Sequence, residues 1–365
     1  MSEKKIRTGI IGATGMVGQR FISLLSDHPY FDISVLAASP RSAGKTYGEA
    51  VGGRWKMPDS IPENIGKKTV LDAAEIQKVS GLCDFVFCAV EMPKDETKKL
   101  EEAYAKTETP VVSNNSACRG YADVPMLIAE INSPHLAVVE TQKKRLGTKT
   151  GFIAVKPNCS IQSYVPMLTP MLKYGLKEVA VTTYQAISGA GKTFDEWPEM
   201  IDNVIPYIGG EEEKSEKEPM KVWGTVKNGE VENAKNPPIT SQCIRVPVTN
   251  GHLAAVFVKF EGKPPKKDEI IKLWKDFAGE PQALSLPSAP KQFIHYFEED
   301  NRPQTKSERD LENGMAVSAG RLREDMSGIF DFKFVGLSHN TIRGAAGGGV
   351  LSAELLYKKG FIIKK

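Results

Sequence analysis

A glycine-rich turn close to the amino terminus is the feature that most constrains the fold. Ile6 to Ile11 is a short apolar run typical of a buried strand, and it leads directly into Gly12-Ala13-Thr14-Gly15-Met16-Val17-Gly18. From Met16 to Ser26, apolar residues recur at helical spacing. Glycines between a strand and a helix let the backbone turn tightly and approach a pyrophosphate at the amino end of the helix. The pattern predicts the first unit of a dinucleotide-binding domain.

Further apolar runs continue this pattern through the first half of the chain. Ile33 to Ala38 stands where a βαβ unit returns its next parallel strand, and Phe85 to Val90 and Pro110 to Ser113 are typical of further buried strands. We therefore expect an α/β fold whose residues 1–157 form a Rossmann-like, doubly wound nucleotide-binding domain.

The character of the sequence changes after Gly151. Segments rich in β-formers follow without regular helices between them: Glu178–Ser188, Ile239–Val248, Ala254–Glu261, Ala316–Arg323 and Ile329–Gly336. This pattern predicts that residues 158–340 form an α+β catalytic and dimerisation domain with a largely antiparallel sheet. Residues 341–365 include small residues suited to close helix packing, and we expect this helix to return to the nucleotide-binding domain.

Composition excludes several classes of function. The 48 basic and 45 acidic residues are spread along the chain, so the net charge of +3 provides no surface for nucleic acid. No apolar leader follows Met1 and no run is long enough to cross a bilayer, so we expect a cytoplasmic protein without membrane contact. The five cysteines show neither CxxC nor metal-ligand spacing, which argues against disulfides and against a metal site.

The residues after the second predicted strand indicate which dinucleotide is bound. An NAD-preferring domain usually has Asp or Glu there, but this chain has Ser39-Pro40-Arg41-Ser42. A cation and hydroxyls favour the 2′-phosphate of NADP, although without the glycine turn Arg41 would be interpreted as a solvated loop arginine. The candidate cofactor contacts in this part of the chain are Gly12, Thr14, Gly15, Met16, Val17, Ser39, Arg41 and Ser42.

Cys159 is the candidate nucleophile. The predicted strand Gly151–Pro157 delivers it to the start of an apolar-periodic segment that ends near Lys173, and hence to the amino end of a helix. Backbone donors and the helix dipole are expected to lower its pKa from the reference of about 8.5. A lone buried cysteine is usually a small hydrophobe. Here, however, His252 follows a strand and a glycine turn and can act as a general base near neutral pH.

Six motifs, in the order in which they occur, resemble those of the aspartate-β-semialdehyde dehydrogenase family, particularly its fungal and archaeal branch. The resemblance runs essentially from end to end, and its motifs are highly specific. They are Gly12–Gly15, Ser39–Ser42, Pro157–Ser160, Gln185–Gly191, Arg245–Val248 and His339–Gly347.

The resemblance implies roles for individual residues. Cys159 would be the nucleophile, Gln185 would orient the acyl intermediate, and His252 would be the acid/base, with Asn158 helping to stabilise the oxyanion. The implied substrate contacts are Arg245 for the carboxylate, Glu218 for the amino group, and Lys221, Arg119 and Asn115 near the phosphate. The implied contacts on the nicotinamide side are Ser188, Gly189 and Asn340.

Two features of the chain qualify this assignment. Glu211 to Glu218 is a charge run that would ordinarily be a solvated helical face. Cys118 stands where the family commonly has an aromatic residue, so the packing around Arg119 is not predicted.

The implied activity is the reversible, NADP-dependent reductive dephosphorylation of 4-phospho-L-aspartate to L-aspartate 4-semialdehyde through a cysteine thioester. This oxidoreductase reaction belongs to the biosynthesis of lysine, threonine, methionine and isoleucine, has inorganic phosphate as a second ligand, and implies a homodimer or homotetramer. Two alternatives are a malonyl-CoA-type acyl-CoA reductase and a non-catalytic NADP-binding sensor.

Overall fold

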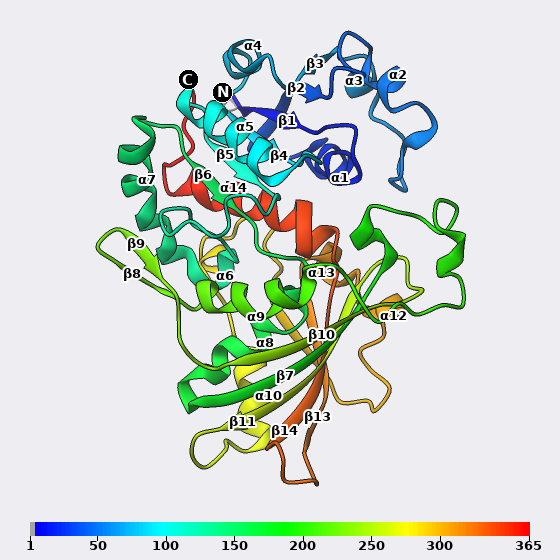
Figure 1. Cartoon of the computed structure of the whole chain (residues 1–365), viewed down its shortest axis with the longest axis vertical. Coiled ribbons are helices and arrows are strands. Elements are labelled where there is room, and N and C mark those ends of the chain that lie inside the picture. The colour runs from blue at the N-terminus through cyan, green and yellow to red at the C-terminus, as the bar shows by residue number, and fades with distance from the viewer. Residues whose placement is uncertain (1–3) are drawn as a thin grey trace.

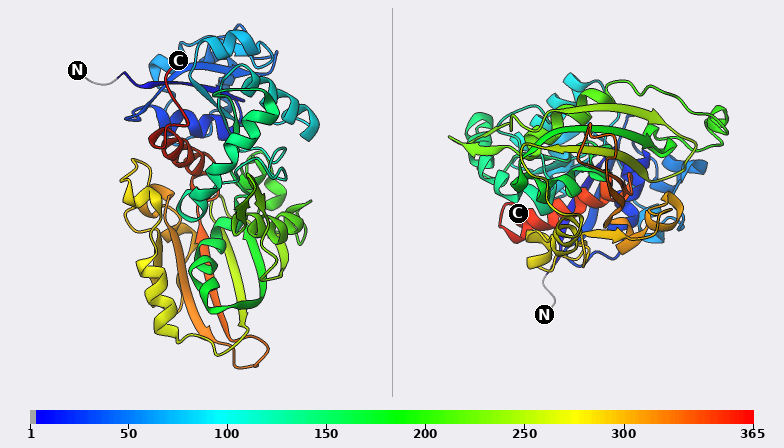
Figure 2. Two further views of the ribbon diagram at one scale, coloured as in Figure 1. Left: turned by 90° about the vertical axis from the view of Figure 1, so that its left-hand side faces the viewer. Right: turned by 90° about the horizontal axis from the view of Figure 1, so that it is seen from below.

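A computed structural model describes residues 4–365 and shows two sheets placed end to end along the long axis of the molecule (Figures 1 and 2). The amino-terminal half forms the sheet at one end, and the later strands form the sheet at the other. The carboxyl-terminal helix lies between them, beneath the first sheet (Figure 1).

The first sheet is parallel throughout, with the strand order β3-β2-β1-β4-β5-β6. This order confirms the predicted Rossmann-like domain, because it reverses at β1, where dinucleotides bind beyond the carboxyl ends of the strands. The short β3 was not predicted, since only its first residue is buried. The strands are β1 (Ile6–Ile11), β2 (Phe31–Ala38), β3 (Val70–Asp72), β4 (Phe85–Cys88), β5 (Val111–Ser113) and β6 (Ile153–Val155).

Helices cover this sheet, and the last one comes from the far end of the chain. The helix α14 (Gly347–Lys358) contacts α1, β5 and α6, which agrees with the expected return of the carboxyl terminus. The domain boundaries at residues 157 and 340 stay predictions. The other helices of this part are α1 (Met16–Leu25), α2 (Tyr47–Val51), α3 (Glu63–Gly66), α4 (Ile76–Gly81), α5 (Lys94–Lys106), α6 (Ala129–Asn132) and α7 (Val139–Leu146).

The second sheet is mixed, with the order β10-β7-β11-β14-β13-β12. Its three inner pairs are antiparallel, as predicted, but the outer pairs β10–β7 and β12–β13 are parallel. A parallel pair needs a crossover connection, and residues 186–238, which include α9 (Glu211–Val222), provide one between β7 and β10. The strands are β7 (Leu176–Gln185), β10 (Ile239–Arg245), β11 (His252–Phe260), β12 (Ile294–Phe297), β13 (Val317–Glu324) and β14 (Phe332–Ser338).

Short helices and one hairpin complete this half. The helix α9 lies against β10, and α10 (Lys267–Asp276) packs near β12. The remaining elements are the hairpin β8 (Thr225–Lys227) and β9 (Glu230–Glu232), and the helices α8 (Val165–Leu168), α11 (Glu280–Ala283), α12 (Thr305–Glu308) and α13 (Leu311–Gly314).

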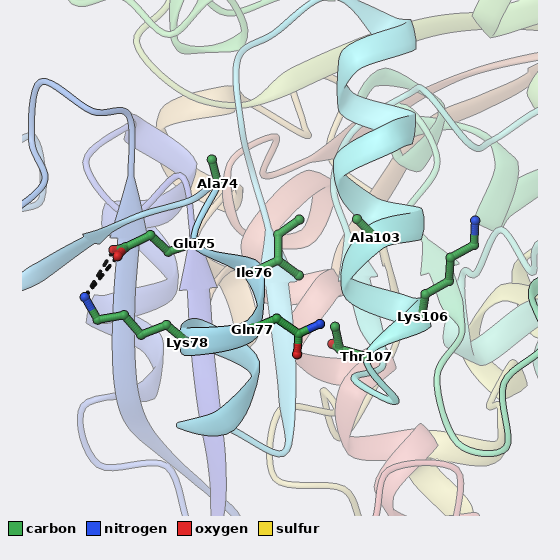
Figure 3. Close-up of a pocket in the computed structure, with 8 residues that line it drawn as sticks. All are labelled: Ala74, Glu75, Ile76, Gln77, Lys78, Ala103, Lys106 and Thr107. Carbon is green, nitrogen blue, oxygen red and sulfur yellow. Dashed lines mark hydrogen bonds and ion pairs between the residues drawn. The ribbon is translucent and has the colours of Figure 1, made fainter.

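A depression on the surface between α4 and α5 lies apart from the predicted site (Figure 3). It is lined by residues 74–78 together with Ala103, Lys106 and Thr107, and none of the predicted site residues borders it. Among the helices of residues 4–365, none combines the length and apolar character needed to cross a membrane.

Candidate active site

The glycine turn has the shape that a bound pyrophosphate needs. Gly12 has a φ of 85°, and a Cβ there would lie 2.3 Å from Ala89 O. A Cβ on Gly18 would lie 2.3 Å from Gly12 O, so the turn closes tightly against the first turn of α1. Gly15 is exposed, and no side chain in residues 4–365 caps α1. The first amides of this helix therefore remain available to an anion.

The end of β2 brings Arg41 to the same edge of the sheet. Gly12 N and Ala13 N both donate to Ala37 O, at 2.8 and 3.1 Å, which ties the turn to the end of β2. Ser42 N donates to Ser39 O at 2.9 Å and folds residues 39–42 into a turn in which Arg41 is exposed. An exposed guanidinium there fits a ribose 2′-phosphate better than a ribose diol.

The three predicted nicotinamide contacts lie together. Asn340 Nδ2 donates to Ser188 Oγ at 2.9 Å, and Asn340 Oδ1 accepts from Gly251 N at 2.8 Å. A Cβ on Gly189 would lie 3.2 Å from His252 Nε2, so a glycine is needed for close approach. The nicotinamide contacts therefore adjoin the predicted catalytic histidine.

Cys159 and His252 are brought together from separate elements. Cys159 follows β6, His252 begins β11, and Sγ lies 3.5 Å from Nε2. His252 Nδ1 accepts a hydrogen bond from Ala186 N at 3.0 Å. A neutral imidazole that accepts at Nδ1 carries its proton on Nε2, so the resting ring presents an N–H to the sulfur.

Cys159 lies at the amino end of a helical turn, as expected, but the expected lowering of its pKa is wrong for this structure. The residues after it form only a four-residue 3₁₀ helix, Ser160–Ser163, whose dipole is small. Burial, with Glu211 adding to it, raises the pKa of the Cys159 thiol to about 11. Burial, with Arg245 adding to it, lowers the pKa of His252 to about 3. Both groups are therefore uncharged near neutral pH when no ligand is bound.

Glu211 is the carboxylate that joins the catalytic residues, and the sequence analysis did not single it out. Both of its oxygens accept from Asn158 Nδ2 at 2.9 Å, and Oε2 also accepts from Gln185 Nε2 at 3.3 Å. Lys214 Nζ lies 2.8 Å from Oε1. Glu211 therefore holds both predicted amides next to Cys159.

Glu218 and Lys221 are buried and already have partners. Arg119 Nη1 lies 2.8 Å from Glu218 Oε1, and Asn158 N donates to Glu218 Oε2 at 2.5 Å. Lys221 Nζ donates to the carbonyls of Arg119 and Tyr121, and burial lowers its pKa to about 8. This side of α9 is not the solvated face that a charge run usually forms. Glu218 and Lys221 instead hold Arg119 in place.

Arg245 lies beside His252, whereas the side chain of Asn115 is bonded to a carboxylate of α5. Arg245 is buried at the end of β10, and its Nη1 donates to Ala186 O at 2.6 Å, next to His252. Asn115 donates its side-chain amide to Glu101 Oε1 at 3.0 Å. The Asn115 amide is thus used by a buried carboxylate of α5, and no hydrogen bond within residues 4–365 joins it to Arg119 or Lys221.

The chain is similar over nearly its full length to proteins of one family. Residues 7–139 match the model described as "Semialdehyde dehydrogenase, NAD binding domain", and residues 168–343 match "Semialdehyde dehydrogenase, dimerisation domain". Aspartate-semialdehyde dehydrogenase from Aspergillus fumigatus is 39% identical, with 99% of each chain covered. The protein of that name from Methanothermobacter thermautotrophicus is 41% identical, with 96% of this chain and 99% of the other covered.

This chain belongs to the aspartate-semialdehyde dehydrogenase family. The fold agrees with this family. A crystal structure of aspartate semialdehyde dehydrogenase with NADP from Candida albicans is 38% identical, covers 98% of this chain and 100% of its own, and superposes with a TM-score of 0.88. The family resemblance inferred from the sequence motifs is confirmed.

The spacing of charged residues in α9 indicates which of its side chains face the site. A Glu-x-x-Lys pattern occurs twice in this helix, as Glu211–Lys214 and as Glu218–Lys221. The two copies are seven residues apart, which is close to two helical turns, so both lie on the same face. That repeat is the sequence signal that could have identified Glu211. The partners distinguish the two copies, because Glu211 contacts the side-chain amides of Asn158 and Gln185, whereas Glu218 is paired with Arg119.

Proposed function

We propose that this protein catalyses the reversible, NADP-dependent reductive dephosphorylation of 4-phospho-L-aspartate to L-aspartate 4-semialdehyde. The reaction is a step in the biosynthesis of lysine, threonine, methionine and isoleucine. The observation that carries the proposal is the 3.5 Å contact between Cys159 Sγ and His252 Nε2, at the end of the cofactor sheet, in a chain similar throughout to enzymes named for this reaction.

The covalent step begins when the Cys159 thiol gives up its proton, with His252 as the acid/base that assists its movement, and becomes a thiolate. Its sulfur attacks the acyl carbon of the substrate, the C–S bond forms, and the bond from that carbon to the phosphate oxygen breaks. The His252 Nε2–H donates to the sulfur and so favours the thiolate. The products of this half-reaction are a thioester on Cys159 and inorganic phosphate. Arg119 would form an ion pair with that phosphate.

The substrate's other charged groups require a fixed arrangement of partners. Arg245 suits the substrate carboxylate, because a guanidinium can donate two parallel hydrogen bonds that an ammonium cannot copy. For the amino group, the two carboxylates of α9 compete. Glu211 contacts the amides beside Cys159, whereas Glu218 is paired with Arg119, so we assign the amino group to Glu211 and the orientation of Arg119 to Glu218.

NADP would be held by the glycine turn, by Arg41 at the ribose phosphate, and by Ser188, Gly189 and Asn340 at the nicotinamide. When bound in its reduced form, the cofactor would supply the hydride that reduces the thioester carbonyl. The chain's own part is to leave the α1 amides free and to keep the space beside His252 open by having glycine at position 189.

A homodimer or homotetramer in the cytoplasm completes the proposal. Alternate side chains of β7 and β11 are only half-buried, which leaves one face of the mixed sheet available to a second copy of the chain. The family model that covers these strands is described as a dimerisation domain.

One pair of assays separates this function from its rivals. NADPH formation is followed with aspartate semialdehyde and phosphate, and NADPH oxidation is followed with malonyl-CoA. The proposal requires activity in the first assay that Cys159→Ala abolishes. Turnover of malonyl-CoA alone would identify an acyl-CoA reductase, and cofactor binding without either activity would identify a sensor.

The assignment of the amino group has its own test. Glu211→Gln is expected to lower kcat/KM for aspartate semialdehyde at least tenfold more than Glu218→Gln does. Glu218→Gln is the matched comparison, with the main effect expected in the KM for phosphate because Arg119 loses its partner. The reverse pattern would return the amino group to Glu218.

A further inference from the structure

Lys56 reaches from the loop after α2 to the loop that carries the nicotinamide contacts. Its Nζ donates to Gly191 O at 2.9 Å and to Glu196 Oε2 at 2.6 Å. Figure 1 shows the blue loop after α2 descending toward the green loop after β7, which places the two ends of this contact in the two halves of the molecule. The Lys56 side chain is 17% exposed, so the contact is partly shielded from solvent.

On the side of the first sheet, Lys56 is fixed relative to the glycine turn. Gln19 of α1 donates from Nε2 to Thr14 O at 3.0 Å, and its Oε1 accepts from Lys56 N at 2.8 Å. Tyr47 of α2 donates from its hydroxyl to Ala13 O at 2.9 Å. Gln19 and Tyr47 are both buried, so water competes little for these hydrogen bonds. The start of the loop that carries Lys56 is therefore tied to the pyrophosphate-binding segment.

On the other side, Lys56 binds the segment that continues from the nicotinamide contacts. Gly191 N donates to Ser188 O at 3.0 Å, so the carbonyl that accepts from Lys56 belongs to the same turn as Ser188. Glu196 Oε2 also accepts from Thr193 N at 2.9 Å and from Thr193 Oγ1 at 3.3 Å, which folds residues 193–196 into a second turn. One ammonium group thus holds two successive turns of this loop.

The proposed path of the dinucleotide gives this contact a consequence for binding. The pyrophosphate is assigned to the glycine turn and the nicotinamide to Ser188 and Gly189, so one ligand has to reach both segments at once. A ligand that spans two segments binds more tightly when their separation is already correct, because less conformational freedom is then lost on binding. Lys56 sets that separation without having to contact the ligand.

This contact differs from an ordinary surface ion pair, which contributes little to stability. Glu63 and Lys67 form such a pair within α3, with side chains 84% and 75% exposed. Lys56 instead joins distant segments and has a backbone carbonyl as a second acceptor. The Lys56 ammonium, followed by Thr193 N–H, also holds the pKa of Glu196 below its usual range, so this carboxylate is charged near neutral pH.

We propose that Lys56 is a positioning residue for the cofactor. By binding Gly191 O and Glu196, it holds the nicotinamide-binding loop at a fixed distance from the glycine turn, so that both ends of one NADP molecule reach their sites together. The inference rests on the proposed function in placing NADP between these two loops.

The test compares the whole cofactor with a fragment that occupies only one end of the site. The Kd values of NADPH and of adenosine 2′,5′-bisphosphate, which lacks the nicotinamide, are measured for the full-length protein by fluorescence titration and by competition. Lys56→Met removes the contact. Glu196→Gln removes only the charge and keeps an acceptor for Thr193 N. Lys67→Met is the matched control, because it breaks the exposed ion pair with Glu63 in the same half of the molecule.

The Kd of NADPH is expected to rise about 3- to 10-fold in Lys56→Met and roughly 2- to 3-fold in Glu196→Gln, and to stay constant in Lys67→Met. The double variant should match Lys56→Met, because Glu196 acts through Lys56. The Kd of adenosine 2′,5′-bisphosphate should stay constant throughout, since this fragment does not depend on the separation of the loops.

Three results would each overturn the inference. The first is a rise of less than about twofold for NADPH in Lys56→Met. The second is an equal loss for the fragment, which would show that Lys56 acts on the glycine turn alone. The third is an unchanged NADPH affinity in Glu196→Gln, which would show that Lys56 contacts the cofactor itself. Failure of the wild type to bind either NADPH or the fragment would instead overturn the proposed function, which separates the two failures.

Discussion

The buried ion pair between Glu130 and Arg343 supports a prediction about stability. The carboxylate on α6 and the guanidinium just before α14 form two hydrogen bonds, of 2.6 and 2.5 Å, and their side chains are 0% and 1% exposed. Arg343 also lies over the Phe293 ring at 4.6 Å and donates to Gln162 Oε1 at 3.2 Å. The pair thus joins the carboxyl-terminal helix to the rest of the molecule.

Removing one partner should cost much more than removing both. Glu130→Leu leaves Arg343 as an uncompensated buried cation, and loss of one partner of such a pair costs about 3–5 kcal/mol. Arg343→Met leaves a buried carboxylate, with a cost of similar size. In the double variant no buried charge of the pair is left, so its cost should be well below the sum of the single costs.

Urea unfolding of the wild type, the two single variants and the double variant gives this coupling energy. The expected interaction is at least about 2 kcal/mol in favour of the double variant. Single variants that each lose less than about 1 kcal/mol, or a double variant that loses the full sum, would show that the pair is not desolvated as its burial indicates.

Three further predictions concern the site. Cys159→Ala should abolish turnover with NADP affinity nearly unchanged, because the thiol lies outside the glycine turn; retained activity in the NADPH assay would remove Cys159 from the mechanism. Arg41→Ala should raise the Kd for NADP at least tenfold and leave that for NAD almost constant, and equal losses by fluorescence titration would contradict the assignment of the 2′-phosphate. Lys221 has its pKa lowered to about 8, so between pH 8 and its unfolded value of about 10.4 the unfolded chain binds more protons and stability rises with pH. Lys221→Met should flatten the stability–pH curve in that window, and an unchanged slope would refute this.

Features that depend on local pattern were predictable from the sequence. The strand, glycine turn and helix from Ile6 to Leu25 agree with the structure nearly residue for residue, because strand burial and glycine requirements are set within a few neighbouring positions. The separate motifs that carry Cys159, Gln185, Arg245 and His252 also identified residues that the fold brings together.

Features that depend on which faces meet could not be predicted in the same way. The parallel edges of the second sheet follow from crossover connections, and β12 is a short strand with only Ile294 fully buried. Asn115 donates its side-chain amide to Glu101 of α5, a contact between distant segments that no local pattern predicts, and its place near the phosphate stays a prediction.

The sequence by itself determined the nucleotide-binding unit, the family and the candidate nucleophile, because each is specified by residue types at fixed spacing. The tertiary structure alone decided the electrostatics of the site. It distinguished Glu211 from Glu218 on one helix and raised the thiol pKa that a helix was expected to lower. The physical reason is that a pKa depends on burial and on charges brought from distant segments, and neither is encoded in the spacing of neighbouring residues.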